Sequence, residues 1–267
     1  MNKFLLPPSL AVLASIASAG GGDGTRHPAR DPGTAALHPC KDLKALPTAQ
    51  CGTLRVPLDR TNPSAGTTDI SFALLPRRDQ TKPSLGTIVP NPGGPGTATI
   101  AFAGPLYAAA LAPILNRREL LLIDTRGVGR SSALSCPALN DPARVFGSIQ
   151  QQRAAIGKCG SELGHKARFY GTVAIADDFN DVRAALGIKQ LDLLGDSYGT
   201  FLMTTYAQRY PNHVRSVILS GAYPVNPNAS SDLEIAALRR AITLVGDRTG
   251  AQHRDDQSLE WNVQCFG

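Results

Sequence analysis

The pentapeptide Gly195-Asp-Ser-Tyr-Gly199 constrains this chain more than any other stretch of its sequence. It follows the apolar run 191–194, which is typical of a buried strand, and precedes a helix-like run, 200–210, that stops at Pro211. A strand, a G-x-S-x-G turn and a helix form the context of a nucleophile elbow. In such an elbow the serine hydroxyl stands above the sheet edge, and the helix N-terminus supplies partial positive charge. We therefore predict that Ser197 is a catalytic nucleophile, with a purely structural tight turn as the alternative.

Apolar runs bounded by turn residues predict strands along the rest of the chain, and a helix over 173–186 that ends at Gly187. The first two strands are joined by a turn rich in Pro, Gly and Ser, and we expect them to pair antiparallel. The later strands alternate with helical segments, which predicts an α/β fold with a parallel sheet and right-handed crossovers. The predicted strands are 52–59, 69–76, 86–90, 119–124, 191–194 and 214–219.

Residues 1–19 have the form of a secretory signal peptide. Lys3 precedes an apolar stretch, and Ala17-Ser-Ala19 is a small-residue cleavage site. A membrane anchor fits less well, because the apolar run is short and is interrupted by Pro7 and Pro8. No other segment approaches transmembrane length, so we expect a secreted or periplasmic protein with no stable membrane span after cleavage.

Charge and cysteine content limit the partners of this chain. The formal net charge is +6, and Lys and Arg are scattered, so nucleic acid is not an expected partner. Five cysteines in an exported chain favour pairing. Local pairing gives Cys40–Cys51 and Cys136–Cys159, each contributing about 3 kcal/mol through loop entropy, and leaves Cys265 single. The cysteine spacings match no metal-ligand pattern, so zinc is not expected.

A glycine-rich loop, Asn91-Pro-Gly-Gly-Pro-Gly96, follows the predicted strand 86–90. A dinucleotide-binding loop would need Gly or Ala where Thr99 stands, and Pro95 lacks an N–H that a phosphate cradle would use. An oxyanion loop fits better, because glycines let a bare backbone N–H approach the substrate oxygen. We predict that Gly94 and Tyr198 supply the two N–H donors. A Gly-Pro turn without chemistry is the alternative.

The turn from Asp124 to Ser131 follows another predicted strand at the edge where ligands bind in open α/β sheets. A structural role is nevertheless favoured. Gly127 and Gly129 supply special backbone angles. Arg126 is expected to tie loops together rather than to contact substrate.

These motifs, in this order and together with Cys51-Gly-Thr-Leu-Arg-Val-Pro-Leu-Asp59, resemble the proline iminopeptidase and tripeptidyl aminopeptidase family of secreted α/β-hydrolase serine peptidases. The match covers roughly residues 40–225. The resemblance implies an α/β-hydrolase fold with helices on both faces of a mostly parallel sheet. It also implies release of N-terminal residues from peptides by acyl transfer through Ser197, with Gly94 and Tyr198 at the oxyanion positions and no cofactor. Some relatives resemble esterases, so a carboxylesterase acting on small esters is the alternative enzyme.

The chain departs from this family after the last predicted strand. The fold places the catalytic Asp and His on loops that follow two further strands. Only His213 and His253 follow Ser197. We expect His213 on the surface at the opposite end of the sheet, and His253, in a polar stretch, is a weak candidate for the base. The expectation is therefore a truncated chain that lacks its last strands and is not a competent hydrolase alone. The alternative from a different functional class is a non-catalytic remnant, which folds or binds but does not turn over substrate.

The expected organisation is a signal peptide (1–19), an N-terminal linker (20–50), the α/β-hydrolase core (51–225) and the start of a cap or lid (226–267). Apolar residues at helical spacing predict a cap helix over 230–245. Asp232 and Glu234 in its first turn could bind a substrate ammonium, although acids there commonly just complement the helix dipole.

Overall fold

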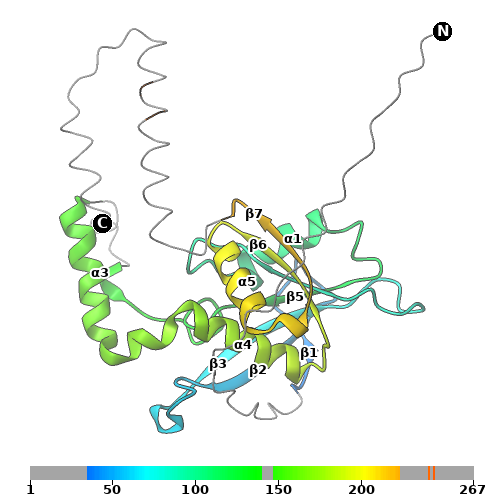
Figure 1. Cartoon of the computed structure of the whole chain (residues 1–267), viewed down its shortest axis with the longest axis horizontal. Coiled ribbons are helices and arrows are strands. Elements are labelled where there is room, and N and C mark those ends of the chain that lie inside the picture. The colour runs from blue at the N-terminus through cyan, green and yellow to red at the C-terminus, as the bar shows by residue number, and fades with distance from the viewer. Residues whose placement is uncertain (1–34, 140–146, 223–239, 241–242, 244–267) are drawn as a thin grey trace, which may run out of the picture. The chain divides into compact units, whose positions relative to one another are not determined.

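The computed structural model describes residues 35–139, 147–222, 240 and 243, and Figure 1 shows their arrangement. These residues form one seven-stranded sheet with the order β1-β2-β3-β5-β4-β6-β7. The strands from β1 to β5 in this order pair antiparallel, and those from β5 to β7 pair parallel. The strands are β1 His38–Pro39, β2 Gln50–Pro57, β3 Thr67–Leu75, β4 Thr87–Asn91, β5 Glu119–Ile123, β6 Leu191–Asp196 and β7 Val214–Ser220.

Helices follow each of the strands β4 to β6, as the alternating pattern predicts. The mostly parallel arrangement and the helices on both faces are those expected of an α/β-hydrolase fold. Gly187, with φ 67°, follows α4, where the sequence predicts its stop. The helices are η1 Pro63–Ala65, the π-helix η2 Thr99–Ala103, α1 Gly104–Ala110, η3 Pro137–Leu139, α3 Ile149–Leu163, η4 Gly164–Tyr170, α4 Thr172–Ala185, α5 Tyr198–Arg209 and η5 Pro211–His213.

Two apolar cores lie on the two faces of the sheet, because side chains alternate between faces along each strand. In β5, Leu121 and Ile123 pack with α4 and α5, whereas Leu120 and Leu122 pack in the second core, beside α1. The central strands are therefore covered on both faces, which explains their continuous apolar runs.

The segment 35–50, which the sequence assigns to the linker, contributes to the second core. Leu43, Leu46 and Ala49 are buried there, and β1 pairs with β2. Both expected disulfides are present, Cys40–Cys51 and Cys136–Cys159. The predicted signal peptide over 1–19 and the single Cys265 lie outside the described residues.

The Cys40–Cys51 bridge ties this segment to β2, and removing it should measurably destabilise the fold. Because it closes a loop across 11 positions, the double replacement of both cysteines by alanine should lower the free energy of unfolding by about 3 kcal/mol. Urea denaturation of the variant beside the wild type measures this difference. An unchanged unfolding midpoint would show that packing alone holds the segment in place.

Strand β7 is an edge strand of the sheet among the described residues. Its side chains are largely accessible, and Ile218 is 62% exposed. Among the described residues, this edge of the sheet therefore leaves apolar side chains uncovered. No helix in the described part of the chain is both long and apolar enough to cross a membrane.

Candidate active site

Ser197 occupies the turn between β6 and α5, as the elbow motif predicts. Its backbone has φ 52° and ψ −126°, and only one other described non-glycine residue, Ser132, has a positive φ. The Ser197 N–H donates to the Ser220 carbonyl of β7 at 3.0 Å, and its own carbonyl accepts from the Thr200 N–H at 2.9 Å. Hydrogen bonds on both sides thus hold a backbone conformation that costs on the order of 1–3 kcal/mol. The serine side chain is exposed above the strand end.

The two glycines of the motif are required by close backbone contacts. A Cβ on Gly195 would lie 2.5 Å from the Gly199 carbonyl oxygen, and a Cβ on Gly199 would lie 2.2 Å from the Asn91 carbonyl oxygen. Either side chain would force the strand, the helix or β4 apart. Both motif positions therefore require glycine.

The glycine-rich loop after β4 packs directly against the elbow. A Cβ on Gly93 would lie 2.3 Å from the Asp196 carbonyl oxygen and 2.7 Å from the Tyr198 nitrogen. Gly93 has φ 79°, and its N–H donates to the Asn91 side-chain oxygen at 3.0 Å. Asn91 is only 3% exposed. Asn-Pro-Gly is a typical turn signal in which the amide closes the turn, and this was the available sequence signal for the role of Asn91.

These contacts leave two backbone donors beside the nucleophile. The Gly93 N–H is committed to Asn91, whereas within the described residues the Gly94 and Tyr198 N–H groups donate no hydrogen bond. Tyr198 begins α5, so its N–H is one of the free donors of a helix N-terminus. The predicted pair Gly94 and Tyr198 therefore remains available to a ligand oxygen, and its role is a proposal.

Asp124 connects the loops that follow β4 and β5. Its fully buried carboxylate accepts from the Ile100 N–H at 2.9 Å and from the Arg130 N–H at 2.8 Å. A Cβ on Gly129 would lie 2.3 Å from the Asp124 carboxylate. The structural interpretation of this turn is confirmed.

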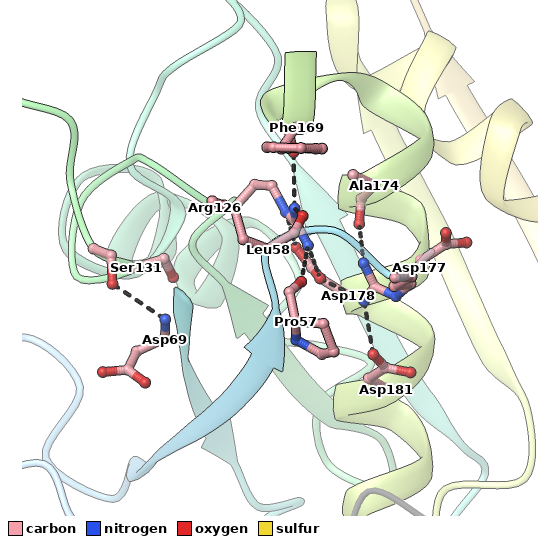
Figure 2. A network of polar contacts seen from close by, with 12 residues as sticks. Pro57, Leu58, Asp69, Arg126, Ser131, Phe169, Ala174, Asp177, Asp178 and Asp181 are labelled. Carbon is pink, nitrogen blue, oxygen red and sulfur yellow. Dashed lines mark hydrogen bonds and ion pairs between the residues drawn. The ribbon is translucent and has the colours of Figure 1, made fainter. Parts of the chain in front are cut away.

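Arg126 lies at the centre of a buried polar network, shown in Figure 2. Its guanidinium donates to both oxygens of Asp178 on α4 at 2.6 Å, and to the Leu58 and Phe169 carbonyls at 3.0 and 2.8 Å. Arg126 is 2% exposed. The predicted role of this arginine in tying loops together is confirmed.

Arg60 extends the network to a second carboxylate of α4. Its guanidinium lies 2.6 Å from Asp178 and 2.7 Å from Asp181. Burial alone would lower the pKa of Arg60, but the two carboxylates raise it above its ordinary value. Through these carboxylate contacts, Arg60 and Arg126 anchor α4 to the loops after β2 and β5.

Asp196, the residue before the nucleophile, makes a polar contact that the sequence did not predict. The Tyr107 hydroxyl of α1 donates to the Asp196 carboxylate at 2.5 Å. Burial, together with this hydrogen bond, raises the pKa of Tyr107 above its ordinary value. The place of Asp196 inside the G-x-S-x-G motif puts it beside the nucleophile. The sequence does not reveal its partner, because Tyr107 is 89 positions away.

His213 lies at the far end of the sheet from the nucleophile. It closes η5 directly before β7 begins, whereas Ser197 follows the end of the parallel strand β6. Its Nδ1 lies 3.2 Å from the Lys189 carbonyl oxygen. His213 is the sole histidine after Ser197 in the described part, as expected remote from the site, and His253 lies outside that part.

Three curated proteins have sequences similar to this chain. Serine protease Hip1 of Mycobacterium tuberculosis is 35% identical over 222 residues, which are 76% of this chain and 41% of that protein. Tripeptidyl aminopeptidase of Streptomyces lividans is 30% identical over 195 residues, covering 67% and 36%. Carboxylesterase B of Mycobacterium tuberculosis is 34% identical over 219 residues, covering 75% and 42%.

This chain therefore spans about two fifths of the length of the curated relatives it matches. A family model described as the alpha/beta hydrolase fold matches residues 86–249, more than half of the chain. With the strand order, the elbow and the glycine-rich loop, this match shows that the chain belongs to the alpha/beta hydrolase family.

Proposed function

We propose that the full-length protein is an exported serine hydrolase, an aminopeptidase that releases N-terminal residues through an acyl-enzyme on Ser197. The observation that supports this most is the exposed serine held at positive φ at the carboxyl end of β6. That end of a parallel sheet is where ligands bind in α/β folds. The relatives named as a serine protease and a tripeptidyl aminopeptidase support a peptide substrate.

The proposed reaction begins with attack of the Ser197 hydroxyl oxygen on the scissile carbonyl carbon. The resulting oxyanion accepts hydrogen bonds from the Gly94 and Tyr198 N–H groups. Collapse expels the amine product, and water then hydrolyses the acyl-enzyme. A general base must take the serine proton. In this fold the base follows the nucleophile in the chain, so we propose that it lies outside the described residues, with His253 as the histidine to test.

The proposed oxyanion donors predict a specific loss of rate. Gly94→Val should lower kcat roughly 10²- to 10³-fold, because a branched side chain at φ 47° forces the N–H away from the oxyanion. The melting temperature should fall about as much as in Gly96→Val, because both positions have a positive φ and a Cβ at Gly94 meets only Thr97, at 3.1 Å. Gly96→Val is the matched control in the same loop, in open space and also at positive φ. Equal rates for both variants would return this loop to a structural role.

A carboxylesterase is the second candidate, supported by the relative named Carboxylesterase B. The same nucleophile and donors would serve an ester. Comparing hydrolysis of an aminoacyl amide and of a short-chain acyl ester by the full-length protein separates the two functions. A requirement for a free N-terminus identifies the peptidase, and ester hydrolysis alone identifies the esterase.

Export is proposed from the signal-like residues 1–19 and from the two disulfides, which persist in oxidising compartments. N-terminal sequencing of the mature protein tests this directly. We expect the mature chain to begin at Gly20, and a chain that still begins at Met1 would contradict export by cleavage.

A further inference from the structure

Asp196 is the chain neighbour of the nucleophile, and its carboxylate has no cationic partner among the described residues. It accepts one hydrogen bond there, from the Tyr107 hydroxyl. Several other partly or fully buried carboxylates of the described part each pair with an arginine: Glu119, Asp177, Asp178, Asp181 and Asp192. The fully buried Asp124 instead accepts from two backbone N–H groups.

The position of Asp196 brings this carboxylate to the ligand-binding edge of the sheet. Asp196 is the last residue of β6 and shares a face with Leu194, which packs in the core beside α1. Its side chain reaches Tyr107 of α1, and its carbonyl oxygen lies against Gly93 of the glycine-rich loop. The residue thus joins the nucleophile turn to both segments that border the proposed oxyanion site.

A half-buried carboxylate with one partner has unused acceptor capacity. An ionised carboxylate offers about four lone-pair sites, and a charge withdrawn from water without a counter-charge is costly. Tyr107 supplies a hydrogen bond but no positive charge, since its pKa is raised by burial and by Asp196, and the phenol stays neutral. A ligand cation would complete the site by a charge-assisted hydrogen bond.

We propose that Asp196 binds the protonated α-amino group of the substrate and that Tyr107 holds the carboxylate in place. This inference rests on the proposed peptidase function and names its substrate class, peptides that lose one N-terminal residue. In such a substrate the α-nitrogen lies about 2.5 Å from the scissile carbonyl carbon, two bonds away. The Cα atoms of the adjacent residues Asp196 and Ser197 are about 3.8 Å apart, and the proposal requires their side chains to meet two groups that close.

The kinetic test uses the full-length protein with alanyl p-nitroanilide, its N-acetylated form and p-nitrophenyl butyrate. Asp196→Asn should raise KM for the free amine roughly 10- to 100-fold, the value of a charge-assisted hydrogen bond, and leave the butyrate ester within about threefold. Asp196→Glu keeps the charge and should retain part of the preference for the free amine. Tyr107→Phe removes the hydrogen bond that positions the carboxylate but keeps its charge, so it should raise KM for the free amine by less than Asp196→Asn does.

Equal losses on the amine and the ester would assign Asp196 a structural role and overturn the proposal. A wild-type enzyme that does not distinguish the free from the acetylated amine would also overturn it. Calorimetry distinguishes failure of the peptidase function from failure of the ammonium site. It measures the binding of alaninamide and of N-acetylalaninamide to the Ser197→Ala protein. If alaninamide binds and Asp196→Asn weakens that binding while no amide is hydrolysed, the ammonium site stands and the peptidase function fails. If amides are hydrolysed and Asp196→Asn changes nothing, the function stands and this site falls.

Discussion

Replacing Ser197 by alanine should lower kcat of the full-length protein by about 10⁶, the loss expected when the nucleophile of a serine hydrolase is removed. The fold should be unaffected, because the Ser197 hydrogen bonds with Ser220 and Thr200 are made by its backbone. Backbone donors and substrate binding alone retain only about 10³–10⁴ of the rate enhancement over water. Steady-state hydrolysis of aminoacyl-amide and short-ester substrates measures the effect.

Ser220→Ala is the matched control for this substitution. Ser220 ends β7 beside the elbow, its side chain is exposed, and only its carbonyl contacts Ser197. The control should keep wild-type kcat. A Ser197→Ala enzyme that retains turnover, or a Ser220→Ala enzyme that loses it, would move the nucleophile away from the elbow.

Replacing Asp178 by asparagine should cause the largest loss of stability, about 3–5 kcal/mol in the free energy of unfolding. The change leaves the Arg126 guanidinium, whose side chain is 0% exposed, without its carboxylate partner. The Leu58 and Phe169 carbonyls still accept its hydrogen bonds but carry no compensating charge. Denaturant unfolding followed by circular dichroism measures the loss.

The exposed pair Arg55 and Asp69 provides the control. The side chains of this pair are 71% and 36% exposed, so Asp69→Asn should cost less than about 1 kcal/mol. A similar effect of the two substitutions would mean that the buried network contributes no more than a surface ion pair.

Local signals explain what the sequence could predict. The strands, the elbow and the stop of α4 each depend on residues close together in the chain, such as the apolar run before Gly195 and Gly187 after α4. Each disulfide joins two cysteines that follow one another in the order of cysteines along the chain, so the assumption of local pairing was enough to predict both.

Contacts between distant segments explain what the sequence could not predict. The antiparallel pairing of β3 with β5 depends on how β4 crosses over, and no local pattern encodes it. The same holds for the hydrogen bond of Tyr107 to Asp196. The packing of Leu43 and Leu46 depends on strands distant in sequence, and the Pro- and Gly-rich stretch that precedes this segment is typical of a linker. The role of Asn91 is local by contrast, because the Gly93 N–H donates to the Asn91 side chain two positions earlier, and Asn-Pro-Gly is a turn signal.

The central claim is that Ser197 forms the acyl-enzyme, and covalent trapping tests it most directly. The full-length protein would be treated with an alkyl fluorophosphonate, digested and analysed by mass spectrometry. One adduct per chain on the peptide that contains Ser197, lost in Ser197→Ala and formed in step with inhibition of hydrolysis, is the predicted result. Inhibition accompanied by an adduct on any other residue would contradict the account.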